Sequence, residues 1–490
     1  MRPEFGAFWQ DLATHDRAVA LSDGRRTLRY AELLIEVQQR MVQLAELKAQ
    51  RVALCLDNGI DWALWDLALL FSGRVCVPVP DFFSEGQKVH VLDSAGVDTL
   101  IGGPEALASR CGFAACGLDI AQRALTAVPA LPEGTRKITY TSGTTGQPKG
   151  VCLDAGVQLA VAHSLRQATG ASASDRHLCV LPLATLLENI AGIYTPLLAG
   201  ACIELRGIGD IGLQGASGLD LPRLLGQVLT ISPSSLILVP QLLMALVSAA
   251  ERGMAWPASL RFVAVGGGRV APQLLERAEA LGLPVFEGYG LSECASVVCL
   301  NTPQHRRIGT VGRPLAHLQI SLADDGEVRV RGARMLGYLG EAGLKDDWLA
   351  TGDLGHFEDG FLVLHGRKKH QFITAYGRNV NPEWVEAELT QQASVAQAWV
   401  HGEALPGNLA VLVPRHAAIS DAELGAAVEQ VNAGLPDYAR VGQWLRADQA
   451  FSPANGLATA NGRLCRAVLW AHYEGRFAAA PVTPLTCETS

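Results

Sequence analysis

Residues 140–151 read Tyr-Thr-Ser-Gly-Thr-Thr-Gly-Gln-Pro-Lys-Gly-Val, and the interpretation of the whole chain starts from this stretch. Its three glycines let the backbone adopt positive φ and approach a ligand closely, while its hydroxyl groups and Lys149 supply donors and a positive charge. Such a loop suits the anionic oxygens of a polyphosphate. The residues predicted to surround the phosphates are Thr141, Ser142, Gly143, Thr144, Thr145, Gly146 and Lys149.

Two other interpretations of this stretch are weaker. A phosphate loop of the Gly-x-x-x-x-Gly-Lys-Ser/Thr type fails on spacing, because Gly143 and Gly146 are too close together and Pro148 precedes the lysine. A flexible linker rich in Ser, Thr and Gly would seldom place Pro-Lys-Gly beside a β-type run.

The stretch closely resembles the phosphate-binding signature of the acyl-adenylate-forming superfamily, which includes acyl-CoA synthetases, nonribosomal-peptide adenylation domains and luciferases. The resemblance implies that a carboxylic acid and ATP, with Mg²⁺, give an acyl-AMP and pyrophosphate. It also implies that the acyl group then passes to a thiol, either of CoA or of the phosphopantetheine of a carrier protein.

The length and the composition of the chain favour a multidomain globular protein and exclude several other classes. A chain of 490 residues is too long for one core and predicts two or more domains. A formal charge of -8, without a basic tract of five residues, argues against a nucleic-acid partner. The N-terminus lacks a signal-peptide core, and the early apolar run 52–71 is interrupted by Asp57, Asp61 and Asp66, so we expect a cytoplasmic protein without a membrane span. Eleven cysteines without a Cys-x-x-Cys pair predict reduced thiols rather than a zinc site.

Strand-like and helix-like runs alternate along the first 290 residues, and this order predicts a parallel sheet covered on both faces. Helices are expected from about residue 32 to 47 and from 61 to 71. Strands are expected at 51–56, 75–80, 97–102, 178–183, 235–239, 261–265 and 284–287.

The stretch 181–200 has leucine, isoleucine and tyrosine at helical spacing, which predicts one apolar helix face. By periodicity alone this is an ordinary core helix, but the phrase resembles the helix that borders the acyl tunnel in long-chain fatty acyl ligases. The resemblance implies an acyl pocket at Thr185, Gly192 and Gly266. Thr185 stands where many ligases carry an aromatic residue or a histidine, so the acyl group itself stays open.

Two further motifs follow in the order that the superfamily has. Gly266-Gly267-Gly268 follows a strand but lacks the spacing of a dinucleotide-binding fingerprint. The resemblance places this loop, and the string Glu287-Gly288-Tyr289-Gly290-Leu291-Ser292-Glu293, around the nucleotide. Tyr289 would stack on adenine, Ser292 would offer a hydroxyl group to a phosphate, and Glu293 would offer a hard oxygen to Mg²⁺.

The resemblance also identifies a ribose site and a domain boundary. Asp353, in Thr351-Gly352-Asp353, would accept hydrogen bonds from both ribose hydroxyls, and Arg367 would lie beside the ribose. Lys369 corresponds to the hinge of the superfamily. The segment of Tyr376, Gly377 and Arg378 would line the thiol tunnel after the C-terminal domain turns.

The main departure from the superfamily is Arg463, which stands where its members have a catalytic lysine, and no lysine follows Lys369. Lys149, Glu293 and Arg463 are therefore the predicted catalytic residues. We weigh a fatty acyl-CoA ligase against a ligase that loads an acyl carrier protein, and against a weakly active or non-catalytic nucleotide-binding relative.

The predicted fold class is α/β. A large N-terminal domain, residues 1–368, would combine doubly wound sheets with a small barrel-like β subdomain. A small mobile α+β lid, residues 369–490, would follow it.

Overall fold

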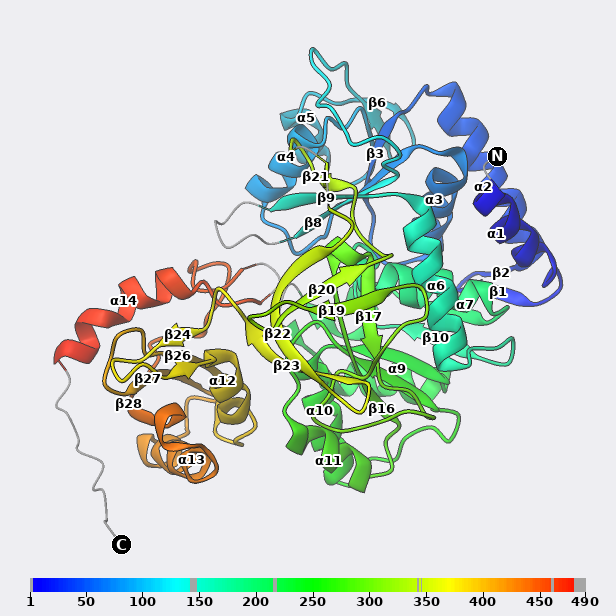
Figure 1. Ribbon diagram of the computed structural model, residues 1–490. Helices are drawn as coiled ribbons and strands as arrows, with labels where there is room; N and C mark the ends of the chain where they lie inside the picture. Colours follow the sequence, from blue (N-terminus) through cyan, green and yellow to red (C-terminus); the bar gives the residue numbers. More distant parts are fainter. Residues whose placement is uncertain are drawn as a thin grey trace, which may run out of the picture.

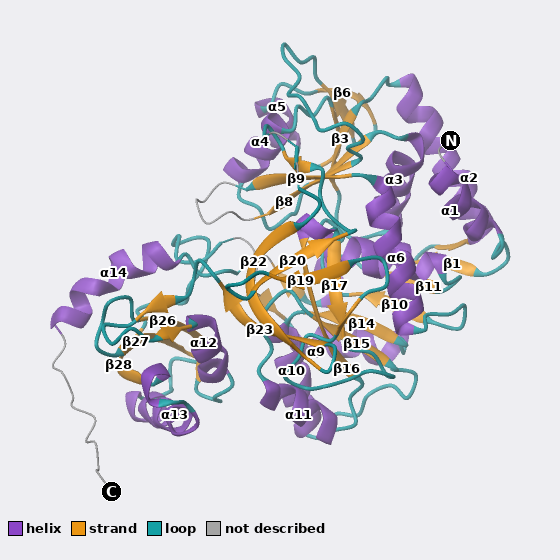
Figure 2. Cartoon of the chain, viewed as in Figure 1, coloured by secondary structure: helices purple, strands orange, loops and turns teal. Residues whose placement is uncertain are grey.

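The structure is a computed structural model that describes residues 3–141, 148–214, 218–341, 343–344, 346–459 and 462–479. In the described residues, a large body contains three main sheets and a two-stranded ribbon, and a smaller C-terminal body lies beside it (Figure 1). Strands and helices alternate through the large body (Figure 2), as the α/β prediction requires. The predicted fold class is confirmed.

An eight-stranded sheet holds the start and the end of the phosphate loop. Its strands, in spatial order, are β21 (Gly337–Tyr338), β9 (Lys149–Leu153), β8 (Lys137–Thr141), β4 (Val75–Pro78), β3 (Arg51–Cys55), β5 (Thr99–Gly102), β7 (Ile120–Gln122) and β6 (Ala114–Gly117). The pairs that join β8, β4, β3 and β5 are parallel, and the others are antiparallel. Helix α2 (Tyr30–Glu46) precedes β3, and α3 (Ile60–Ser72), α4 (Glu85–Ser94) and α5 (Glu105–Arg110) lie between the strands of this sheet.

A nine-stranded sheet forms the second layer of the large body. Its strands, in spatial order, are β18 (Arg313–Pro314), β17 (Ser296–Leu300), β16 (Val285–Leu291), β15 (Phe262–Val265), β14 (Ser235–Leu238), β10 (Arg176–Cys179), β11 (Cys202–Leu205), β1 (Val19–Ser22) and β2 (Thr27–Arg29). The run from β16 to β1 is parallel throughout.

The helices of this half are α1 (Pro3–Ala13), α6 (Ala155–Thr169), η1 (Glu188–Tyr194), α7 (Thr195–Leu198), α8 (Ile208–Ile211), α9 (Leu221–Ile231), α10 (Pro240–Glu251), α11 (Pro272–Ala280) and the short η2 (Ser292–Cys294). A two-stranded ribbon pairs β12 (Leu213–Gln214) with β13 (Gly218–Leu219).

Local sequence explains the ends of α6, the helix that follows the phosphate loop. Asp154 caps its N-terminus, because a side-chain oxygen accepts a hydrogen bond from the Val157 N–H at 2.8 Å. Its C-terminal cap is Gly170 at φ +63°, a left-handed conformation that glycine adopts without a Cβ clash.

The predicted helix after Leu181 departs from regular α geometry. Residues Glu188–Tyr194 form a π-helix, and an α-turn, α7, continues it. Glu188 and Asn189 are buried there together with Ile190. The predicted apolar residues Leu183, Leu186, Ile190 and Tyr194 are buried as expected, but the segment is a π-helix that also buries polar side chains on its other side. The preceding strand β10 also ends at Cys179, earlier than the expected Leu183.

The third sheet of the large body is antiparallel, with the order β19 (Gln319–Leu322), β20 (Glu327–Arg331), β22 (Leu349–Glu358) and β23 (Phe361–Arg367). The C-terminal body contains β26 (Val395–His401), β27 (Asn408–Pro414), β28 (Val441–Arg446), α12 (Pro382–Thr390), α13 (Asp421–Gly434), η3 (Asp437–Ala439) and α14 (Arg466–Ala479). A short hairpin of β24 (Phe372–Ile373) and β25 (Asn379–Val380) follows β23, and its Phe372 and Val380 belong to the core of the C-terminal body.

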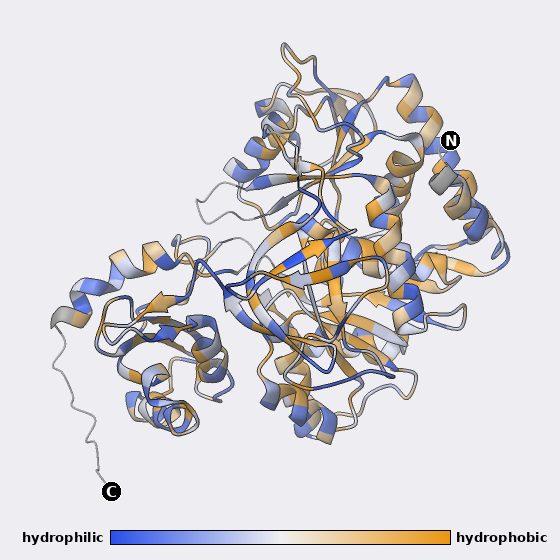
Figure 3. Cartoon of the chain, viewed as in Figure 1, coloured by the Kyte–Doolittle hydropathy of each residue, from blue (hydrophilic) through white to orange (hydrophobic). Residues whose placement is uncertain are grey.

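Apolar side chains fill separate cores in the two bodies. The largest cluster joins α2, α3 and η1 with strands of both large sheets, and two further clusters lie within the C-terminal body. Figure 3 shows hydrophobic residues along the central strands, whereas α13 and α14 carry hydrophilic and hydrophobic residues together. None of the helices in the described ranges combines the length and the apolar character that a membrane crossing requires.

Candidate functional site

Asp353 joins the nine-stranded and the four-stranded sheets at the predicted ribose site. The Tyr289 hydroxyl on β16 donates to its Oδ2 at 2.6 Å, and Nε of Arg367 on β23 lies 2.7 Å from its Oδ1. Burial raises the pKa of the Asp353 carboxyl above its ordinary value, and burial also raises the pKa of the Tyr289 hydroxyl. Asp353 therefore directly contacts two other predicted residues, one on β16 and one on the neighbouring strand β23.

Tyr338 connects two other predicted residues, Glu293 and Lys149. Its hydroxyl donates to Oε1 of Glu293 at 2.8 Å, and Nζ of Lys149 lies 5.2 Å from the centre of its ring. Lys149 Nζ is also 3.5 Å from a carboxylate oxygen of Glu341. The cation of the phosphate loop and the predicted metal ligand thus share one aromatic neighbour.

Strands β8 and β9 hold the two ends of the phosphate loop together. Thr141 and Lys149 are register partners in this antiparallel pair, as are Tyr140 and Gly150. The predicted phosphate-binding residues Ser142, Gly143, Thr144, Thr145 and Gly146 lie outside the described residues.

Glycine is required at two positions near the predicted nucleotide site. A Cβ at Gly290 would lie 1.6 Å from the backbone oxygen of Ser296 on β17, so no side chain fits there. Gly267 adopts φ +80°, which disfavours residues with a Cβ. The other predicted residues of these two segments lie on or directly after β15 and β16, and they are Gly266, Gly268, Glu287, Gly288 and Ser292.

Glu287 is a buried carboxyl group within β16. It is 7 % exposed, and burial raises its pKa to about 8, although the neighbouring Arg269 charge and a backbone hydrogen bond from Val270 act in the opposite direction. Burial therefore favours the protonated, uncharged form of the group.

Arg463 approaches the same region from the C-terminal body. Burial and the nearby Arg367 charge lower the pKa of its guanidinium. The acidic groups Glu293, Glu383 and Asp353 oppose this shift. The residue still keeps an exposed surface. The three predicted catalytic residues, Lys149, Glu293 and Arg463, thus gather around one junction of the large and the C-terminal bodies.

The predicted thiol-tunnel residues lie on the protein surface. Tyr376, Gly377 and Arg378 form the exposed turn between β24 and β25, and the Tyr376 residue is 76 % exposed. Lys369, the predicted hinge, precedes this hairpin, and partial burial together with the Arg367 and Arg463 charges lowers its pKa.

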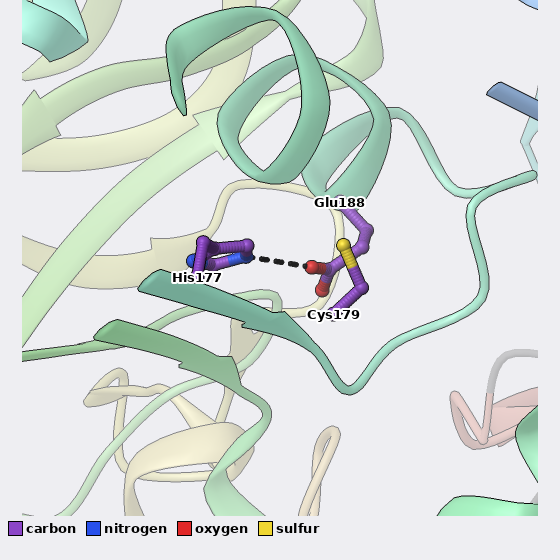
Figure 4. Close-up of side chains that lie close together, drawn as sticks. All are labelled: His177, Cys179 and Glu188. Carbon is purple, nitrogen blue, oxygen red and sulfur yellow. Dashed lines mark hydrogen bonds and ion pairs between the residues drawn. The ribbon is translucent and has the colours of Figure 1, made fainter. Parts of the chain in front are cut away.

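A buried polar group lies beneath η1 (Figure 4). Glu188 reaches from the π-helix toward β10, where its Oε1 meets Nε2 of His177 at 3.1 Å and its Oε2 accepts the Leu181 N–H at 3.1 Å. Among the described residues, His177, Cys179 and Glu188 form the one set of three potential metal ligands within 4.8 Å. The Cys179 thiol donates to the Gly192 carbonyl at 3.7 Å, and burial holds its pKa well above the ordinary value. Because each of these three side chains already has a hydrogen-bond partner within the protein, we assign no metal to them.

The same group explains why residue 192 is glycine. A Cβ there would lie 2.4 Å from Oε1 of Glu188 and 2.9 Å from Nε2 of His177. Gly192 is thus needed for packing, and Thr185 closes a turn by donating to the Pro182 carbonyl at 2.6 Å.

A cavity of about 70 Å³ lies between the nine-stranded sheet and the segment of η1 and α7. Its lining residues are Leu165, Thr169, Ala171, Asp175, His177, Leu187, Ala191, Thr195, Pro196, Ala201, Ser235, Leu236, Ile237, Arg261, Phe262, Ala264, Val297 and Leu300. The predicted pocket residues Thr185, Gly192 and Gly266 are not among them. Their neighbours Leu187, Ala191 and Ala264 form the wall instead.

Comparison with known proteins identifies the family of this chain. The sequence model of the family described as AMP-binding enzyme matches residues 8–343, which is more than half of the chain. The chain belongs to the AMP-binding enzyme family. This AMP-binding enzyme is an ATP-dependent, acyl-adenylate-forming ligase of the acid–thiol type.

Named relatives of this AMP-binding enzyme act on different acids. It is 30% identical over 441 residues to a 2-succinylbenzoate–CoA ligase of Enterococcus faecalis, a match that covers 83% of this chain and 88% of the relative. It is 27% identical over 463 residues to the long-chain-fatty-acid–CoA ligase FadD15 of Mycobacterium bovis, with 75% and 73% covered.

Solved structures share the fold. The O-succinylbenzoate CoA synthetase MenE of Bacillus subtilis, in complex with AMP, has a TM-score of 0.76 at 24% identity and covers 94% of this chain and 97% of that one. The amide bond synthetase McbA of Marinactinospora thermotolerans has a TM-score of 0.77 at 23% identity, with 96% and 100% covered.

Three residues of interest in this AMP-binding enzyme were missed in the sequence. Tyr338 lies on a two-residue strand, which is too short a pattern to predict. His177 and Glu188 stand in apolar surroundings, and a lone polar residue there gives no sign of its partner. Only the pairing of β21 with β9 and the packing of η1 on β10 reveal them.

Proposed function

We propose that this enzyme activates a medium- or long-chain fatty acid to its acyl-AMP and transfers the acyl group to CoA. The observation that carries this proposal is the cavity under η1. Most of its lining side chains are apolar, and strands β14 and β15, which form its floor, run on toward the predicted nucleotide site. Each methylene group buried there would contribute roughly 0.8 kcal/mol to binding.

The cavity is a poor site for an acid with a second carboxylate, such as 2-succinylbenzoate. Such a carboxylate needs a free cation or free donors once it leaves water. Arg261 is the one guanidinium among the described lining residues, and it is already paired with Asp175 at 2.7 Å between Nε and Oδ1. His177 is likewise engaged, by Ser235 at 2.9 Å and by Glu188.

The nucleotide would bind where Asp353, Tyr289 and Arg367 meet. Asp353 would accept hydrogen bonds from the two ribose hydroxyls, in place of some of its present donors. Tyr289 would offer its ring face to the adenine base. The chain segments around Gly267, Gly268, Glu287, Gly288 and Gly290 would form the walls of the base pocket, and Ser292 would face the phosphates.

Electrostatic stabilisation would drive the first half-reaction, an in-line attack of the substrate carboxylate on the α-phosphorus. Lys149, with Thr141 and the loop that follows it, would neutralise the departing pyrophosphate. Arg463 would bridge the carboxylate and the α-phosphate oxygens. Glu293 fits a magnesium ion, because its half-exposed carboxylate keeps lone pairs beyond the one bonded by Tyr338. Magnesium bound there would supply positive charge to the phosphates.

A rotation of the C-terminal part would separate the two half-reactions. We place its hinge at Lys369, between a domain of residues 1–368 and a lid of residues 369–490. After the rotation, Tyr376, Gly377 and Arg378 would replace Arg463 near the acyl-AMP and line the path of the thiol.

A pyrophosphate-release assay tests the proposal. The purified protein is given ATP, Mg²⁺ and either saturated fatty acids, benzoate or 2-succinylbenzoate, with CoA or with a phosphopantetheinylated acyl carrier protein as acceptor. Fatty acids should release pyrophosphate fastest and CoA should accept the acyl group. A preference for 2-succinylbenzoate or benzoate would refute the fatty acid assignment, and transfer to the carrier protein alone would identify the alternative acceptor.

A further inference from the structure

Strand register shows how the cavity runs along the nine-stranded sheet. Ser235 on β14 is paired with Phe262 on β15, and two residues further on Ile237 is paired with Ala264. All four line the cavity, as does Leu236 between Ser235 and Ile237 on β14. The cavity therefore extends from the amino end of these strands to one residue before their carboxyl end at Leu238 and Val265.

The two ends of the cavity have different surroundings. At the carboxyl end, Ala264 is followed by Val265 and by the glycine loop that starts at Gly266. At the amino end, Asp175 and Arg261 directly precede β10 and β15 and line the cavity. The Arg261 side chain is 38% exposed, so it stands between the cavity and solvent.

Arg261 is held in place by several acceptors. Its Nε and Nη2 both bond the Asp175 carboxylate, and its Nη1 donates to the Thr169 carbonyl at 3.0 Å. Its Nη2 also lies 3.4 Å from the Gly170 carbonyl. A cation at these last carbonyls of α6 is favoured by the helix dipole. A bidentate guanidinium pair has a fixed geometry, so Arg261 ties the end of α6 to the strands across the mouth of the cavity.

Asp175 is equally well anchored. It accepts hydrogen bonds from the Ser234 hydroxyl at 2.7 Å and from the Ser172 N–H at 2.8 Å. The residue is 7% exposed. Neither partner of the Arg261–Asp175 pair can therefore swing away without leaving buried polar atoms unpaired, which costs about 1 to 3 kcal/mol for each group.

We propose that the Arg261–Asp175 pair is the end wall of the acyl compartment and sets the longest fatty acid that the enzyme activates. This inference rests on the proposed function, because it requires that the acid enters from the Gly266 end with its tail toward Arg261. An alkyl tail can pack against Phe262, Ile237 and Ala191, but it gains nothing at a guanidinium that is fully paired. A longer tail would have to break that pair.

A chain-length ladder from hexanoate to palmitate, read by pyrophosphate release, tests the proposal. Arg261→Ala opens the amino end, so kcat/KM for acids beyond the wild-type limit should rise about tenfold relative to hexanoate, as expected from burying roughly two further methylene groups. The control is Arg277→Ala. Arg277 forms a similar bidentate pair with Glu251, at 2.7 and 2.8 Å, but does not line the cavity.

A second variant tests the same compartment in the opposite direction, and it also serves if Arg261→Ala does not fold. Ala191→Phe places a ring in the wall and should move the limit to shorter acids. An unchanged ladder in either folded variant, or an equal shift in Arg277→Ala, overturns the inference and leaves the proposed function standing. A wild-type enzyme that activates no fatty acid at any length overturns both.

Discussion

Lys137 and Asp66 form an ion pair in the interior, with Nζ 2.9 Å from Oδ1 and side chains only 2% and 0% exposed. Lys137 begins β8, the strand that leads into the phosphate loop, and Asp66 lies on α3. Asn189 and Tyr194 of η1 complete the network, since both contact Lys137 and both donate to Oδ2 of Asp66. The strand of the phosphate loop and the helix above the cavity are therefore tied to one buried carboxylate.

Lys137→Met should lower the free energy of unfolding by about 3 to 5 kcal/mol, because it leaves Asp66 charged and buried without its cation. Urea denaturation measures the loss. Lys88→Met is the control, since its partner Asp81 is fully exposed and the change should cost less than about 1 kcal/mol. Equal losses in the two variants would show that the buried network adds no stability.

Asp353→Ala should weaken ATP binding by about 1.5 to 3 kcal/mol, because hydrogen bonds from the ribose to a charged acceptor are lost. Calorimetry with ATP and Mg²⁺ measures the change. Asp324→Ala, an exposed carboxylate in the turn after β19, should leave the affinity unchanged. Wild-type protein that binds no ATP at millimolar concentration would contradict the nucleotide site itself.

Arg463→Ala should slow acyl-AMP formation roughly 10- to 1000-fold, which corresponds to about 1.4 to 4 kcal/mol of transition-state stabilisation. Arg463→Lys should speed it, because a compact ammonium fits between two oxygen ligands better than a planar guanidinium. Single-turnover rates separate this step from transfer of a synthetic acyl-AMP, which neither variant should change greatly.

Arg476→Ala is the control for charge in the C-terminal body, because Arg476 lies on α14, away from the junction, and pairs with Asp448. An Arg463→Ala enzyme as fast as wild type would mean that Arg463 takes no part in the chemistry. That result would favour the alternative of a weakly active or non-catalytic nucleotide-binding relative.

Lys369→Pro should leave acyl-AMP formation largely intact and stop thioester formation, because proline fixes φ near -65° and prevents the proposed rotation. Each half-reaction is assayed separately, by pyrophosphate release and by acyl-CoA formation. The control is Lys368→Ala, which keeps the hydrogen bond from the residue 368 N–H to the Gly352 carbonyl. Lys368→Pro would remove that hydrogen bond and is therefore unsuitable. Equal loss of both half-reactions in Lys369→Pro would place the hinge elsewhere.

Glu287 should make the stability of the unliganded protein depend on pH. The pKa of Glu287 in the folded protein, about 8, exceeds its ordinary value of 4.5. Its contribution to the free energy of unfolding is therefore complete below pH 4.5 and is lost as the pH rises through 8. Glu287→Gln should remove this loss, and the wild type should lose a few kcal/mol more than the variant between about pH 5 and about pH 9. Urea denaturation at both pH values measures it. Glu276→Gln, on exposed α11 surface, should behave as wild type.

Local patterns in the chain determined much of the fold. The α2 helix, the strands β3 to β5 and the strands β14 to β16 all lie within a few residues of the expected ranges, because alternation of apolar runs reflects burial in a parallel sheet. The ordered motifs around Lys149, Tyr289 and Asp353 likewise predicted residues that the structure brings to one junction. Such motifs can be recognised in the sequence because the local backbone requires particular residue types. At Gly290, for example, a Cβ would clash with the backbone oxygen of Ser296.

Tertiary packing alone decided what surrounds that junction. The π-helix η1 forms because Glu188 and Asn189 must both face buried partners, His177 on one side and Asp66 on the other, and a helix-period pattern cannot predict partners on other strands. The Lys137–Asp66 pair, the Tyr338 bridge and the Arg261–Asp175 wall each join residues between about 50 and 190 positions apart or on separate elements. The periodicity of apolar residues along the sequence indicates which residues are buried. Which charged side chains pair with one another depends on how the sheets and helices pack.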